Sequence, residues 1–165
     1  MTDLHGWITQ QIERAEATAR AAEKEDGRTW TSHWDEQADA FQIRDGLGIL
    51  VADQLQPSAA ALVTAHDPGA VLRRCAADRK ILDDHTVFGD NSVHCIGCGV
   101  DYESGPLVEN VNDCPTLLAL AEGYGITPEI LAELDRPQAP EPKRRGPDPD
   151  TSRVPAALRG PNWKG

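Results

Sequence analysis

Two cysteines, Cys95 and Cys98, stand two residues apart in the stretch VHCIGCG. This spacing lets one tight turn aim both sulfurs at a single point, which is typical of a structural zinc site. Gly97 and Gly99 supply the backbone freedom for such a turn, including positive φ. The pair therefore predicts a zinc-knuckle-like loop, and any fold of the chain has to bring further ligands to it.

Cys114 is the expected third ligand. Pro115 follows it and favours the first position of a helix. The free amides and the dipole at a helix N-terminus stabilise a thiolate. Zinc in structural sites takes four ligands in a tetrahedron, so one more is needed.

The fourth ligand is sought among His85, His94, an acidic side chain and water. His85 ends a predicted helix on its buried side, beside Leu82, and the loop that follows can return to Cys95. His94 adjoins Cys95, and consecutive side chains of an extended chain point to opposite sides, so both would bind one ion only at a kink. We expect His85, and His94 stays the first alternative.

The fourth cysteine and the unbound thiols have their own interpretations. Cys75 lies almost three helical turns before His85 and is expected to be a small core residue. Uninvolved buried thiols and a redox pair at Cys95 and Cys98 are the alternatives to zinc. A redox pair of the thioredoxin kind stands at a strand-to-helix junction, whereas Gly99 and a polar loop follow here. Three thiolates and one imidazole would leave zinc no open position, so we expect structure and not catalysis.

The rest of the pattern predicts an α+β fold. Apolar residues recur at helical spacing after Asp3, a plausible N-cap, and Asp67-Pro68 opens a second long helix. Asp45-Gly46 predicts the turn of an antiparallel hairpin. The expected elements are a helix over 3–24, a small sheet over about 30–51, a helix over 57–65, a helix from 68 to about 85, a short helix after Cys114 closed by Gly123 or Gly125, and a last helix opening at 127–129.

Charge and proline divide the chain into a body and a tail. Residues 1–135 hold 24 acidic and 9 basic residues, a net charge of −15, whereas residues 136–165 hold 3 acidic and 7 basic residues, a net charge of +4. We expect one α+β domain over 1–135. Seven of the 12 prolines fall in the tail, which we expect to be disordered on its own.

Charge and the N-terminal sequence also limit the expected partners and the expected cellular location. Phosphate affinity comes mostly from Lys and Arg, so we do not expect the body to bind nucleic acid. The expected partner is another protein. The chain begins MTDLHGWITQ, without a basic and then apolar leader, and its longest apolar stretch is too short for a bilayer. We expect a cytoplasmic protein that does not enter membranes.

Three other groups of residues invite a functional interpretation, and each has a simpler one. His66-Asp67 resembles a dyad, but Asp67 is explained as an N-cap. Trp30 and Trp34 would stack a ligand, but we expect them in the core between sheet and helices. The basic run at 143–145 would touch an acidic partner, but a solvated run in the tail is expected.

The stretches HDPGAVLRRCAADRKILDDH, CIGC and CPTLLALA follow one another in the chain. In these stretches, and in order over about residues 1–125, the chain resembles an uncharacterised family of small proteins from actinomycetes and their phages. The specific parts of this resemblance are 66–68, 81–85 and 114–117. The resemblance implies an α+β fold and a set of metal ligands made of the histidine at the end of 81–85 and the cysteines. This supports His85 over His94. Cys75, where an apolar or acidic residue is usual, and the basic tail depart from the family.

The sequence thus predicts a small cytoplasmic binding or regulatory protein, stabilised by zinc at His85, Cys95, Cys98 and Cys114. The resemblance adds an accessory role of phage origin as an expectation and implies no reaction. Two alternatives remain. One is a thiol-redox enzyme that uses Cys95 and Cys98. The other is an acidic inhibitor that mimics nucleic acid and occupies a basic protein, for which the charge of the body is the support.

Overall fold

The computed structural model describes residues 3–87, 92–101, 103 and 105–137. Its fold is α+β, as predicted. The elements are α1 (Leu4–Asp26), β1 (Trp30–Asp35), β2 (Ala40–Asp45), β3 (Leu50–Leu55), α2 (Pro57–Ala65), α3 (Pro68–Asp84), β4 (Val100–Asp101), β5 (Gly105–Pro106), the 3₁₀ turn η1 (Val111–Asp113), α4 (Pro115–Gly123) and α5 (Pro128–Glu133). None of the helices in these residues is long and apolar enough to span a membrane. The tail from residue 138, with the basic run at 143–145, lies outside the described residues.

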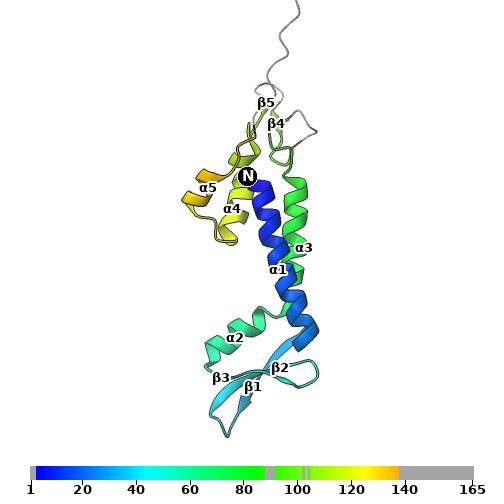
Figure 1. Cartoon of the computed structure of the whole chain (residues 1–165), viewed down its shortest axis with the longest axis vertical. Helices are drawn as coiled ribbons and strands as arrows, with labels where there is room; N and C mark the ends of the chain where they lie inside the picture. The colour runs from blue at the N-terminus through cyan, green and yellow to red at the C-terminus, as the bar shows by residue number, and fades with distance from the viewer. Residues whose placement is uncertain (1–2, 88–91, 102, 104, 138–165) are drawn as a thin grey trace, which may run out of the picture.

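Helices α1 and α3 lie side by side and form the long axis of the molecule (Figure 1). Both begin at the predicted caps, because Asp3 accepts a hydrogen bond from the Gly6 amide and Asp67 accepts one from the Ala70 amide. The buried stripe of α1 faces the main core, whose members come from α1, α3, α4 and the loop around the cysteines. They are Leu4, Ile8, Ile12, Cys75, Leu82, Cys95, Val111, Cys114, Leu117 and Ala121.

One end of the helix pair carries the sheet end, which we define as β1, β2, β3 and α2. The strands form an antiparallel sheet in the order β1-β2-β3. The predicted turn after β2 is held by the Asp45 carboxylate, which accepts from the amides of Leu47 and Ile49 at 2.9 and 2.7 Å. Ile43 of β2 and Ala60 of α2 are fully buried, so the sheet end has a small core of its own beside the main one.

The prediction that Trp30 and Trp34 lie in the core is wrong for Trp34, which is 49% exposed. Its ring packs edge-on against Phe41, its cross-strand partner, with centroids 5.2 Å apart. Trp30 is half-buried, and its indole N–H donates to the Asp26 carbonyl at 3.1 Å. The Trp34 ring therefore packs on its cross-strand partner and remains partly exposed to solvent.

The other end is the cysteine end, which we define as the described residues between 85 and 137. Here α4 and α5 lie beside the start of α1 (Figure 1). The predicted closure of α4 is confirmed, since the helix ends at Gly123 and Gly125 adopts a φ of +83°. The short β4–β5 ladder stands in a region that the sequence predicted as loop.

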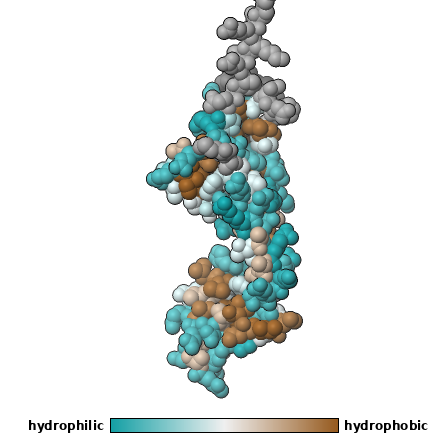
Figure 2. Space-filling view, in the orientation of Figure 1, coloured by the Kyte–Doolittle hydropathy of each residue, from teal (hydrophilic) through white to brown (hydrophobic). Residues whose placement is uncertain are grey.

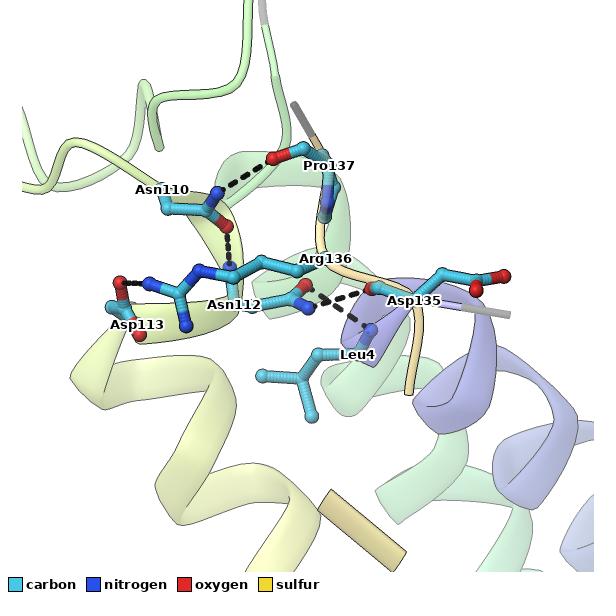
Figure 3. A network of polar contacts seen from close by, with 7 residues as sticks. All are labelled: Leu4, Asn110, Asn112, Asp113, Asp135, Arg136 and Pro137. Carbon is cyan, nitrogen blue, oxygen red and sulfur yellow. Dashed lines mark hydrogen bonds and ion pairs between the residues drawn. The ribbon is translucent and has the colours of Figure 1, made fainter. Parts of the chain in front are cut away.

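Asn112 ties this end together, as Figure 3 shows. Its side-chain carbonyl accepts from the Leu4 amide at 3.2 Å, and its side-chain N–H donates to the Asp135 carbonyl at 2.9 Å. Asn110 donates in the same way to the Pro137 carbonyl at 2.8 Å. Residues 135–137 thus form a strap across η1 and the first turn of α1, just before Cys114.

Candidate metal centre

Three segments that are distant in the chain deliver four side chains to one point. His85 is the residue that ends α3, and its amide donates to the Ile81 carbonyl at 3.0 Å. Cys95 and Cys98 stand in the loop before β4. Cys114 closes η1 and is the N-cap residue of α4. Its sulfur thus lies at the helix N-terminus predicted for it, where free amides and the dipole favour negative charge.

The four donor atoms lie within 4.8 Å of one another. From His85 Nδ1 the distances are 3.5 Å to Cys95 Sγ, 3.8 Å to Cys98 Sγ and 3.4 Å to Cys114 Sγ. Cys98 Sγ and Cys114 Sγ are 3.5 Å apart. Every residue of the predicted ligand set is therefore in the cluster, and the cluster could bind a metal ion.

These distances are those of the edges of a small tetrahedron. An ion bound to sulfur at about 2.3 Å and to nitrogen at about 2.0 Å holds its ligands about 3.5 Å (S to N) and about 3.8 Å (S to S) apart. The three sulfur-to-nitrogen distances scatter around the first value, and the sulfur-to-sulfur distance lies slightly below the second. Four of the six distances between the donor atoms thus match a tetrahedron around one central ion, and the remaining pairs lie within 4.8 Å.

Two glycines shape the turn, for different reasons. Gly99 has a φ of +87°, the left-handed conformation predicted for this motif. Gly97 is required because of space: a Cβ there would lie 2.4 Å from the Asp84 carbonyl oxygen and 2.8 Å from His85 Nδ1. The close approach of Gly97 to the end of α3 therefore sets the distance between the thiol pair and the imidazole.

The surroundings of the cluster shift the pKa values of its thiols upward. Burial raises the pKa of the Cys95 thiol, and burial together with the neighbouring thiols raises the pKa of Cys98 to about 12. Cys95 and Cys114 are fully buried, and Cys98 is half-buried. Raised pKa values favour the neutral thiols, and a divalent ion bound at the sulfurs would stabilise the thiolates instead.

Two candidates lie apart from the cluster. His94, the alternative fourth ligand, has Nδ1 2.7 Å from the Ser92 hydroxyl and does not belong to the group of four. Cys75 is buried in the main core, as predicted, on α3 and almost three turns before His85. The structure thus separates the four clustered side chains from the other cysteine and histidine that the sequence offered.

The His66-Asp67 pair serves the backbone. Asp67 caps α3, as expected, and His66 Nδ1 lies 2.9 Å from the Leu62 carbonyl. A carbonyl only accepts, so this nitrogen carries a proton and donates it. Neither group is arranged to activate the other.

Sequence reasoning missed a polar pair made of the buried Asp78 and the half-buried Tyr124. The Tyr124 hydroxyl donates to Asp78 Oδ2 at 2.6 Å, and Asp78 is only 8% exposed. Burial, helped by this bond, raises the pKa of Tyr124, so the phenol stays a donor. Asp78 lies in α3, Tyr124 is the residue that follows α4, and the two are 46 positions apart, so no local pattern connects them.

An α+β chain with one imidazole and three thiols around a common centre is a candidate metal-binding protein. The chain belongs to a family of unknown function, DUF6221, whose family model matches residues 1–129. The match includes all four residues of the cluster and ends before the strap at 135–137. Neither a curated protein nor a solved structure matches the chain.

Proposed function

We propose that the chain is a non-catalytic binding protein whose cysteine end is held by one structural zinc ion. His85, Cys95, Cys98 and Cys114 are the proposed ligands. The observation that carries the proposal is the close spacing of one nitrogen and three sulfurs. This donor set binds zinc in preference to harder metal ions. Four protein ligands leave no position for a substrate or an activated water, so the role of the ion is structural.

A protein partner is the proposed target of the sheet end. Large apolar side chains are exposed there, and Figure 2 shows apolar residues gathered over this end of the molecule. The most exposed are Leu47, Ile49 and Leu62, at 87%, 59% and 62%. Clustered exposed apolar residues are typical of interaction surfaces. A cytoplasmic location and an accessory role of phage origin remain predictions.

Metal analysis of the purified full-length chain tests the zinc proposal. We expect one zinc per chain in the wild type and loss of that zinc in His85→Ala. Cys75→Ala and His94→Ala are the matched controls, because each removes a potential ligand outside the cluster, and both should keep the metal. Wild-type protein without metal, or a Cys75→Ala variant that loses it, would contradict the proposal. Zinc retained in His85→Ala and lost in His94→Ala would move the fourth ligand to His94.

A further inference from the structure

A cleft between the two ends of the molecule is lined by residues of α1, α3, α4 and the end of α2. In Figure 1, α2 and α4 project to the same side of the helix pair. Figure 2 shows the molecule hollowed at this level. Two adjoining cavities form the cleft, with volumes of about 340 and about 480 Å³. Ala15, His66 and Val71 line both of them, so the two share a wall. Volumes of a few hundred Å³ are in the range of small-molecule sites.

The walls of the cleft are mainly apolar. Ala70 and Val71 of α3 face Ala119 and Leu120 of α4 across the first cavity. The second cavity continues along α1 to Trp30, whose indole is fixed by its bond to Asp26. Apolar walls with an aromatic ring held in place suit the apolar body of a small organic molecule.

Polar groups stand at defined places in this apolar surface. The buried Asp78 and the half-buried Tyr124 line the first cavity, with the carboxylate already accepting from the phenol. Arg74 lies one turn before Asp78 and is exposed, and it has no ion pair or hydrogen bond among the described residues. Arg14 lines the second cavity, and its guanidinium donates to the Gln11 side-chain carbonyl at 3.4 Å.

The charge of the cleft is opposite to that of the molecule around it. Its charged lining residues are Arg14, Arg74 and the buried Asp78, whereas residues 1–135 have a net charge of −15. The other well-placed arginine of α3, Arg79, is already paired with Glu16 at 3.0 Å. Two exposed guanidinium groups that have no carboxylate partner in the described part of the chain therefore remain for a ligand that carries a negative charge.

We propose that this cleft binds a small organic acid, with its apolar body between α1, α3 and α4 and its carboxylate at Arg74. The proposal does not depend on the zinc ion, since none of the four clustered residues lines the cleft. It gives the binding protein a ligand class, an amphipathic monocarboxylate, that is distinct from a protein partner at the sheet end.

Three probes with one tail and different head groups test the proposal. The full-length, zinc-loaded chain is titrated with octanoate, octan-1-ol and octylamine while amide NMR shifts are followed. We expect octanoate to bind about fivefold more tightly than octan-1-ol, which is the gain of one exposed ion pair. The shifts should centre on residues of α1, α3 and α4 that line the cleft, such as Ala15, Val71 and Tyr124.

Matched variants distinguish binding in the cleft from a general effect of surface charge. Arg74→Gln should weaken octanoate about fivefold and leave octan-1-ol unchanged. Arg73→Gln, the same change one residue earlier and outside the cleft, should leave both unchanged. Ala15→Leu fills the wall shared by the two cavities and should weaken all three probes while the chain keeps its melting temperature.

Several results would overturn the proposal. Octylamine as the tightest probe would show that Asp78 sets the charge preference. Equal effects of Arg74→Gln and Arg73→Gln, shifts centred on the sheet end, or no probe with a Kd below about 1 mM would also overturn it. Zinc content is measured in every variant and should stay at the wild-type value, so failure here leaves the metal proposal standing.

Discussion

At the cysteine end, segments from three distant parts of the chain meet at four side chains, whereas at the sheet end neighbouring segments pair with one another. The imidazole and the thiols come from residues 85, 95, 98 and 114. Strands β1, β2 and β3 follow one another directly and form their ladder in chain order. Closing long loops costs more chain entropy than forming hairpins, so the cysteine end has the greater need of a cross-link.

The two ends also differ in what they bury. Cys95 and Cys114 belong to the main core together with Leu4 and Leu117, so the proposed ligands are part of the packing. The sheet end buries Ile43 and Ala60 and exposes several large apolar residues, among them Leu47, Ile49 and Leu62. We infer that a metal holds the first end, and that the second gains from contact with a partner.

Removal of the metal is the strongest test of this difference between the two ends. With zinc withdrawn by excess chelator, we expect the cysteine end to lose several kcal/mol of stability, since structural zinc supplies on the order of 10 kcal/mol in small domains. Amide hydrogen exchange should accelerate in η1 and α4 and change little around Ile43 and Ala60. Added zinc should restore protection. Equal loss of protection at both ends would show that they unfold as one unit.

Local signals are sufficient to predict most of the helices and the hairpin. Asp3, Asp67 and Thr127 each start a helix by accepting a backbone hydrogen bond, which depends on neighbours a few residues away. The carboxylate of Asp45 organises its turn in the same local way. The clustering of the four donor residues was predictable as well, because zinc chemistry restricts spacing and residue type more than packing does.

Contacts between distant segments explain what the sequence did not reveal. The strap contributes backbone carbonyls of Asp135 and Pro137, and a carbonyl has no side-chain signature. The β4–β5 ladder is two residues long on each side, too short for any periodicity. Exposure of Trp34 depends on which part of the sheet a helix covers, and this is decided by tertiary packing.

A smaller effect is expected at Gly97, where the variant tests whether the space beside His85 governs metal binding. Gly97→Ala places a Cβ 2.8 Å from His85 Nδ1 and closer still to the Asp84 carbonyl, so the imidazole has to move. We expect metal binding to weaken about 10- to 100-fold, as for other changes that disturb ligand orientation. A competition titration against a chromophoric chelator measures this affinity.

The matched control for this change is Gly123→Ala at the same end of the molecule. A Cβ at Gly123 would meet no heavy atom within 4 Å, and the backbone there needs no positive φ. Its metal affinity should equal that of the wild type. Equal weakening in both variants would mean that the space beside His85 does not govern the site.

The smallest effect is expected at Asn112, and it tests how far the cysteine end relies on its polar network. Asn112→Ala removes the bonds to the Leu4 amide and the Asp135 carbonyl, and Leu4 is fully buried, so its amide is left without this acceptor. We therefore expect a loss of about 1–2 kcal/mol in urea unfolding, between the net value of an ordinary hydrogen bond and the cost of an unsatisfied buried donor. Gln37→Ala, an exposed amide of the sheet end, is the control and should stay within about 0.5 kcal/mol of the wild type. Faster hydrogen exchange in Asn112→Ala should be confined to the strap and the first turn of α1, because the sheet end shares no contact with Asn112. Faster exchange at β2 would instead mean that the two ends are coupled through α1.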